Sequence, residues 1–368
     1  MPTLTARARA SVLLLLSLAC GAGGVDGQSS TDSSASRPRL SALPVVGSAP
    51  ETGFQYGATV LRMFRVGRDT ATRTSQQQLY AIFTAKSQAR AWVQEDRWSE
   101  GNIWRVRGRL EYQRFPLPYY GVGDDTPDSN EEWYTSSGAS GQLMVQRRLG
   151  TALYAGGAAR VFDLAVRDRE PGSALASGTV FGARGGTLVQ AQGFVAHDSR
   201  DHVLSPRAGH LMQLTVSTAG GAIGSRYDFT RYAVDLRRYW TLGSRSHVVA
   251  AQLLGEATTG RAPFDQLVQV GSDTALRGYT RGRYRDHDGM SAQVEYRSPF
   301  WHRLGFTAFG GGGVVAPQLS RLTEATVLPS VGGGLRALLI PAQRATIRVD
   351  FGVGKGSTGL YVALNEAF

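Results

Sequence analysis

Residues 105–112 read Arg-Val-Arg-Gly-Arg-Leu-Glu-Tyr, and this stretch decides the fold. Every second residue is charged, from Arg105 to Glu111, and the residues between them, such as Leu110 and Tyr112, are apolar or small. Successive side chains of a β-strand point to opposite faces, so the spacing predicts a strand with one charged and one apolar face. The charged face needs water, and the apolar face needs either a second sheet or lipid.

The same alternation recurs along the chain, with clear examples at residues 212–217, 231–240 and 347–353. After the N-terminal segment no stretch reaches eighteen apolar residues, which excludes a helical membrane protein. The mean hydropathy of −0.19 is compatible with a transmembrane barrel, because a barrel strand carries its apolar face on every second residue only.

The lengths of the connections favour lipid over a second sheet. Short connections at 150–151, 242–245, 298–302 and 340–342 alternate with long ones at 115–136, 165–184 and 258–288. Outer-membrane barrels have short periplasmic turns, long external loops and even strand numbers. The sequence therefore predicts an all-β protein, an antiparallel transmembrane β-barrel of about fourteen strands, with twelve to sixteen open. The even number leads us to expect that residues 76–97 form one long strand.

The N-terminus has the features of an export signal. Arg7 and Arg9 precede a short apolar run at residues 12–18, and small residues follow. We therefore expect a signal peptide over residues 1–27, a disordered linker over 28–44 and the barrel domain over 45–368. The linker leaves no room for a folded periplasmic domain. The single cysteine, Cys20, lies in the signal segment, and whether it is lipidated stays open.

The formal net charge of +11 raises the question of a nucleic-acid partner. Here the basic residues are spread singly along the predicted strands instead of forming a cluster. We expect them to line the lumen and to face anionic lipid headgroups, so outer-membrane lipid is the predicted partner and nucleic acid is not.

Three stretches share the residue types and the order of one known family. They are Leu276, Arg277, Gly278 and Tyr279 in a loop motif followed by the strand residues Glu295 and Arg297; Asp198, Arg200, Asp201, Pro206 and Gly209 in a turn motif; and Phe368 at the end of the last strand. Together they resemble the BamA/TamA surface-antigen family of outer-membrane proteins, in a short form without POTRA domains. The terminal aromatic is similar to the signal that the barrel-assembly machinery reads.

The resemblance implies a bacterial outer-membrane location and a role in protein or lipid insertion or translocation. It also implies the barrel-assembly machinery as a partner during biogenesis, and a separate periplasmic partner is a further candidate. The family usually carries Phe-x-Asp-x-Gly in the strand after Glu295. This chain has Phe309-Gly310-Gly311, so Gly311 replaces the aspartate and one expected partner of Arg277 is lost.

A physical argument from the residues leads to the same loop. Gly278 permits backbone angles that other residues avoid, which suits a loop tip folded into a crowded lumen. Strand parity places Glu295 on the polar face with Arg297. A guanidinium can bind a carboxylate through two parallel hydrogen bonds, so we expect Arg277 to meet Glu295 inside the barrel. The alternatives are a solvated surface loop and, for the turn motif, a polar turn capped by Asp side chains.

Catalytic and metal sites are not expected. The stretch 352–358, GVGKGST, lacks the Ser or Thr after Lys355 that a phosphate loop requires. The polar cluster at 197–210 contains no nucleophile elbow, and the histidines lack metal-site spacing. We therefore expect a barrel that is no enzyme, has no cofactor and inserts or translocates a client. A passive channel or a receptor that displays its loops is the alternative.

Overall fold

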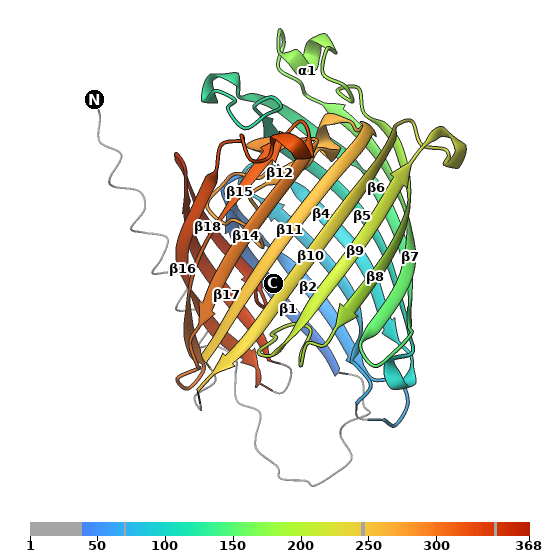
Figure 1. Ribbon diagram of the computed structural model, residues 1–368, viewed down its shortest axis with the longest axis vertical. Helices are drawn as coiled ribbons and strands as arrows, with labels where there is room; N and C mark the ends of the chain where they lie inside the picture. Colours follow the sequence, from blue (N-terminus) through green and yellow to red (C-terminus); the bar gives the residue numbers. More distant parts are fainter. Residues whose placement is uncertain (1–38, 70, 244–246, 342–343) are drawn as a thin grey trace, which may run out of the picture. The chain divides into compact units, whose positions relative to one another are not determined.

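The computed structural model describes residues 39–69, 71–243, 247–341 and 344–368, so the expected signal peptide over 1–27 lies outside the described residues. Sixteen antiparallel strands form one sheet in chain order, which curls into a barrel with β1 beside β18 (Figure 1). The strands are β1 Arg39–Ala49, β2 Gly53–Phe64, β3 Ser75–Thr84, β4 Ala89–Trp98, β5 Trp104–Tyr119, β6 Glu132–Arg148, β7 Leu153–Arg167, β8 Gly186–Asp198, β9 Gly209–Ala219, β10 Asp228–Leu242, β11 His247–Arg261, β14 Asp288–Arg297, β15 Leu304–Ala316, β16 Leu328–Ile340, β17 Ala345–Gly354 and β18 Ser357–Leu364.

Three smaller elements lie in the long loops. Strands β12 Val268–Val270 and β13 Tyr284–Asp286 pair with each other in the connection between β11 and β14. The helix α1 Ala174–Ser177 lies in the connection between β7 and β8, at the top of Figure 1. None of the helices in the described ranges is long and apolar enough to cross a membrane.

The two faces of the strands separate as the alternation predicts. On β5, Leu110 and Tyr112 are 64% and 57% exposed on the outer face. On the inner face, Arg105 and Arg107 both bind Asp96 of β4, with N–O distances of 2.8 and 2.6 Å. The prediction of an antiparallel barrel with an apolar outside and a charged lumen is confirmed.

The expected count of about fourteen strands becomes sixteen, at the upper end of the range left open. The expected single strand at 76–97 is two strands, β3 and β4, because residues 85–88 form a tight turn that contains no Gly, Pro or Asn. The other additional strand is β1, which begins at Arg39 inside the segment 28–44 assigned to the linker. The barrel therefore starts six residues before the expected boundary at residue 45.

Strand length varies around the barrel. The strands β5, β6 and β7 have 16, 17 and 15 residues, whereas β17 and β18 have 10 and 8. A tilted transmembrane strand needs about 9–11 residues to cross the hydrocarbon core. The barrel wall is therefore lowest at β18, where the strand is shortest, and highest at β5 to β7.

The last four residues, 365–368, form a C-terminal tail that turns into the lumen. Asn365 takes a positive φ of 62° and ends the strand. Glu366 then accepts a hydrogen bond of 2.8 Å from Arg336 on the inner face of β16. Phe368 is 4% exposed, its ring packs on Tyr239 of β10, and its carbonyl accepts a bond of 2.9 Å from Arg297.

The position of Phe368 corrects the expectation that Phe368 lies at the end of the last strand. The strand ends at Leu364, and the attraction between Glu366 and the luminal arginines draws the tail inward. Whether Phe368 is also an assembly signal stays a prediction.

Replacing Phe368 with Ser is expected to lower the share of newly made protein that reaches the membrane as a heat-resistant barrel. The loss of a buried aromatic contact costs about 3–5 kcal/mol. Gel migration of unheated and heated membrane samples measures the folded share, and refolding in detergent tests packing without the assembly machinery. Leu319→Ser, at a 59% exposed loop position, is the control. Equal folded shares for Phe368→Ser and wild type would contradict the expectation.

Candidate functional site

The long loop between β11 and β14, residues 262–287, enters the barrel. Leu276 and Tyr279 of the loop motif are 1% and 0% exposed. Gly278 has a φ of 121°, and a Cβ atom there would lie 2.7 Å from the carbonyl carbon of Val353 in β17. Only a glycine allows the loop backbone to approach the wall this closely.

Arg277 lies at the centre of a buried ion cluster. Its Nη2 is 2.5 Å from Glu295 Oε2 on β14, and its Nη1 is 2.6 Å from Asp350 Oδ2 on β17. All three side chains are 0% exposed. The guanidinium also lies over the ring of Phe309, with 3.5 Å between the guanidinium carbon and the ring centroid. The loop is thereby tied to three strands by one side chain.

Further arginines complete the cluster. Glu295 accepts a bond of 2.7 Å from Arg297, and Asp350 accepts bonds of 2.5 and 2.8 Å from Arg336 and Arg348. A buried carboxylate is costly without partners, and here each carboxylate has at least two. The sequence alternation placed Arg348 and Asp350 on the polar face of a strand, but it contained no signal that they meet the loop.

The carboxylate expected at Gly311 is supplied from another strand. A Cβ atom at Gly311 would lie 2.3 Å from the carbonyl oxygen of Ala292, so a larger side chain would not fit without a shift of the backbone. Asp350 provides the second carboxylate instead. Arg277 therefore has a second carboxylate partner besides Glu295, and the sequence analysis did not identify it.

The loop motif is also bonded to the strands that end the barrel. The Tyr361 hydroxyl of β18 accepts a bond of 2.9 Å from the Gly278 N–H and donates one of 3.1 Å to the Tyr279 carbonyl. The Tyr279 hydroxyl donates to Pro329 at 2.6 Å and accepts from the Lys355 N–H at 2.9 Å. Strands β16 to β18 are thus braced from inside.

The turn motif lies in the connection between β8 and β9, residues 199–208. Asp198 accepts bonds of 2.9 and 3.1 Å from Arg200, and Arg73 of the connection between β2 and β3 lies 3.2 Å away. The side chains of the motif therefore link two separate turns at the same end of the barrel.

Asp201 links a third turn. Its carboxylate accepts a bond of 2.8 Å from the Arg207 N–H and one of 2.6 Å from Arg344 in the connection between β16 and β17. Burial opposes ionisation of this group, but the Arg207 N–H and the Arg344 guanidinium hold the pKa of Asp201 below its usual range.

Pro206 and Gly209 shape the same connection. The Pro206 carbonyl accepts a bond of 3.3 Å from Arg297 in the ion cluster. Gly209 has a φ of 94°, and a Cβ atom there would lie 2.1 Å from the Ser199 carbonyl oxygen. The two motifs, which the sequence treats separately, meet through Arg297.

The polar cluster at 197–210 contains a Ser–His contact, but no carboxylate of the described residues is bonded to the histidine ring. Ser199 Oγ is 3.0 Å from His210 Nδ1, and the other ring nitrogen of His210 is 2.8 Å from His197 Nδ1. Arg238 also lies 3.1 Å from His210 Nδ1, so the serine shares that nitrogen with a cation. Within the described ranges no three His, Cys, Asp or Glu side chains are grouped to hold a metal ion.

Comparison with known proteins gives one family match. Residues 70–355 match the family model described as the Omp85 superfamily domain. Among curated proteins, none matches the sequence.

Solved structures match over most of the chain. BamA from Haemophilus ducreyi lacking POTRA domains 1–3 is 15% identical with a TM-score of 0.57, over 89% of this chain and 70% of that one. CdiB from Acinetobacter baumannii is 10% identical with a TM-score of 0.56, over 90% and 65%. CdiB from Escherichia coli is 11% identical with a TM-score of 0.58, over 86% and 61%. At these identities the likeness shows the fold alone, and this chain spans less than two thirds of either CdiB chain.

Arg277→Ala is expected to destabilise the barrel by about 3–5 kcal/mol, because it takes one cation away from each of two fully buried carboxylates. Arg277→Lys should recover little of this, because an ammonium lacks the fork that reaches both carboxylates. Urea unfolding in detergent and the temperature of the gel shift measure the loss. Arg321→Ala, which breaks a pair 63% and 69% exposed, should cost about 0–1 kcal/mol. A lysine variant as stable as wild type would refute this role of the fork.

Gly278→Ala should displace the loop while leaving the strands paired, because the added Cβ meets the backbone of β17 and the φ of 121° disfavours it. Trypsin should then cut within 262–287, a segment with four arginines, in a barrel that still migrates as folded. Gly221→Ala, where nothing lies within 4 Å, is the control. Equal protection of the loop in both variants would mean that the close approach is dispensable.

Proposed function

The chain belongs to the Omp85 superfamily of outer-membrane barrels, and from this premise we propose that it inserts or translocates a protein or lipid client through the seam between β1 and β18. The resemblance to the BamA/TamA family is confirmed, and the protein is an outer-membrane barrel similar to BamA and CdiB. The client, the separate periplasmic partner and the use of the barrel-assembly machinery are parts of the proposal.

One observation carries the proposal: no hydrogen-bonded ladder joins β1 to β18 within the described ranges, whereas every other pair of neighbouring strands in the barrel has one. The two strands are still close, since a Cβ atom at Gly47 would lie 3.2 Å from the Val362 carbonyl oxygen. Unpaired backbone groups in the hydrocarbon core are costly, so such an edge is a place for another strand to pair.

The residues of β1 are typical of a strand at the edge of a sheet. Pro44 lies in the middle of β1, opposite Ala58 of β2. Proline has no N–H to donate, and it is confined to edge strands and bulges within sheets. Strand β18 is the shortest strand of the barrel, with eight residues. Both features weaken the wall at the seam.

The brace formed by the loop motif supports a seam that opens on one side. Tyr361 fixes β18 to the loop, and Asp350 fixes β17 through Arg277. No equivalent bond from the loop motif to β1 is present in the described ranges. We propose that β1 moves and that the C-terminal strands stay in place.

The alternative, a passive channel, requires an open lumen. The loop 262–287 occupies the interior beside β14 to β18, and the tail 365–368 and the connection 199–208 meet at the periplasmic end, where the Glu366 N–H lies 3.5 Å from the Leu204 carbonyl. These obstructions favour low conductance. Steady conductance of the intact protein in planar bilayers would favour the channel.

Locking the seam tests the proposal. Gly47→Cys and Val362→Cys, in a Cys20→Ser background, place two thiols at the close approach of β1 and β18. Oxidation is expected to slow, by about tenfold or more, the insertion of an unfolded test barrel into proteoliposomes or the transfer of a fluorescent phospholipid between leaflets. Reduction should restore the rate, because a covalently joined seam cannot admit a strand or a headgroup.

The control pair is Thr215→Cys with Ala233→Cys, which lie opposite each other in β9 and β10 away from the seam. Oxidation of the control pair should leave the rates unchanged. Equal rates for the oxidised and reduced seam pair would reject the seam as the route.

A further inference from the structure

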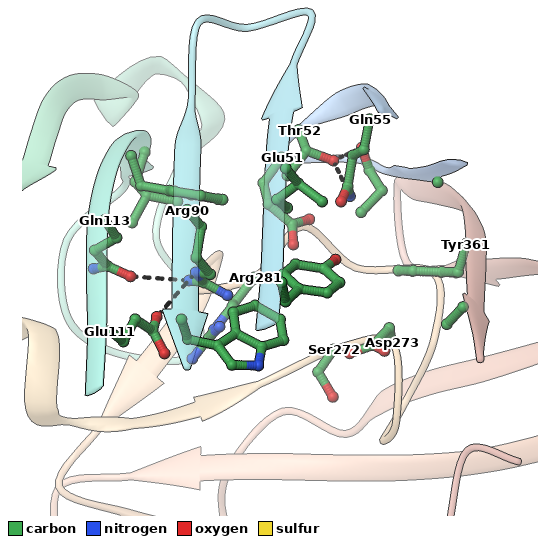
Figure 2. Close-up of a pocket in the computed structure, with 18 of the residues that line it drawn as sticks. Glu51, Thr52, Gln55, Arg90, Glu111, Gln113, Ser272, Asp273, Arg281 and Tyr361 are labelled. Carbon is green, nitrogen blue, oxygen red and sulfur yellow. Dashed lines mark hydrogen bonds and ion pairs between the residues drawn. The ribbon is translucent and has the colours of Figure 1, made fainter. Parts of the chain in front are cut away.

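A chamber of about 790 Å³ lies in the lumen directly behind the seam. Strands β1 and β18 both line it, with residues 44–49 and 362–364, and the opposite wall is formed by β3 to β7. The loop 262–287 covers one side (Figure 2). A volume of this size is typical of sites for small ligands, which range over about 300–1,000 Å³.

Five arginines line the chamber, and Arg90 and Arg109 are the two that pair with a carboxylate among the described residues. Arg285 is buried and donates to the backbone carbonyls of Gly282 and Phe264. Arg90 and Arg109 share Glu111, with N–O distances of 3.1 and 2.5 Å, and Figure 2 shows Arg90 bonded to Glu111 and Gln113.

Arg160 of β7 and Arg281 of the loop line the chamber, and neither guanidinium forms an ion pair or hydrogen bond with a side chain of the described residues. Glu51, in the turn between β1 and β2, lies beside Arg281 and is bonded to its backbone N–H. The cluster therefore has more guanidinium groups than facing carboxylates.

The strand register explains how the cations come together. Arg109 lies opposite Gln142 of β6, and Gln142 lies opposite Arg160 of β7. With about 4.8 Å between neighbouring strands, the backbones of the two arginines are about 10 Å apart with an amide between them. Arg281 approaches from the loop, beside Arg90 (Figure 2).

The acids that border the chamber do not offset this excess. Asp273 binds Arg348 at 2.9 Å, and Asp265 accepts a bond of 2.8 Å from Gln266. Burial raises the pKa of Asp265, and burial also raises the pKa of Glu51 in the turn between β1 and β2. Guanidinium groups that outnumber the carboxylates around a shared cavity favour an anionic ligand.

We propose that this chamber binds the phosphate group of a phosphate ester, with Arg160 and Arg281 as its principal ligands and Gln142 as a neutral donor. Guanidinium forks match the several acceptor oxygens of a phosphate, and amide donors suit the remaining ones. A lipid headgroup can enter through the seam with its acyl chains left in the bilayer, and a soluble phosphate ester can enter from the periplasm. Binding is independent of client insertion, so it goes beyond the proposed function and can fail separately from it.

The loop motif also fixes the position of Arg281 in the chamber. Arg281 follows Tyr279 by two residues, and the bonds from Arg277 and Tyr279 fix the loop that carries it. Arg277 is therefore a positioning residue for Arg281, and it has no contact with the ligand itself.

Calorimetric titration of the full chain in non-ionic detergent tests the proposal with three probes: inorganic phosphate, phosphatidylglycerol and a glutamate-rich peptide. Arg160→Gln and Arg281→Gln should each weaken phosphate or lipid binding roughly tenfold, and the double variant roughly a hundredfold. Lysine at either position should retain part of the affinity. Arg321→Gln removes the same charge from an exposed loop and should change nothing. Gel shift on heating verifies that each variant is folded.

The probes separate the sources of the phosphate. If oxidation of the seam pair slows the binding of phosphatidylglycerol, the result supports a lipid headgroup. If oxidation of the seam pair leaves the binding of inorganic phosphate unchanged, the result supports a soluble ester. Binding of the acidic peptide alone would overturn the proposal. Equal affinity of the double variant and wild type for both phosphate probes, or an equal loss in Arg321→Gln, would also overturn it.

Discussion

The structure depends on one constraint: Arg277 is a permanent cation without access to solvent, and it must meet carboxylates that the barrel wall provides. Glu295 and Asp350 satisfy it from two strands that are not neighbours in the sheet, because β15 and β16 lie between them. Loop and wall therefore form one unit on the C-terminal side of the barrel. The seam next to this unit has no such support, and the contrast between the braced β18 and the free β1 underlies the proposed function.

The alternation of residues foretold the faces of the strands, because period two is a local property that any folded context must respect. It did not reveal the number of strands. Strand β1 contains Pro44 and follows a Ser-rich stretch, so its sequence resembles a linker, and its pairing with β2 is decided only in the sheet. The turn after β3 contains no Gly, Pro or Asn. Ser87 takes the positive φ of 59° that glycine usually provides, so the sequence carries no clear sign of this turn.

The site was predictable to the extent that it depends on strand parity. Parity places Glu295 inside, and the loop motif lies close to it in sequence. Asp350 is 73 residues from Arg277, and their contact arises because the loop lies against the inner face of β14 to β17, which no local pattern contains. For Phe368 the sequence did lead to a prediction, and that prediction was wrong. The sequence placed it at the end of the last strand, but the charge of Glu366 decides the direction of the tail.

The separation of Arg277 and Asp350 along the chain also imposes an order on assembly. While β17 is still outside the sheet, the guanidinium lacks one of its two carboxylates, and a loop seated at that stage would hold a poorly compensated charge. Contacts between distant residues form late, because the intervening chain must first be organised. The loop can thus seat stably only after β14 and β17 are both in the sheet, so neutralisation of one charge marks the completion of the C-terminal side of the barrel.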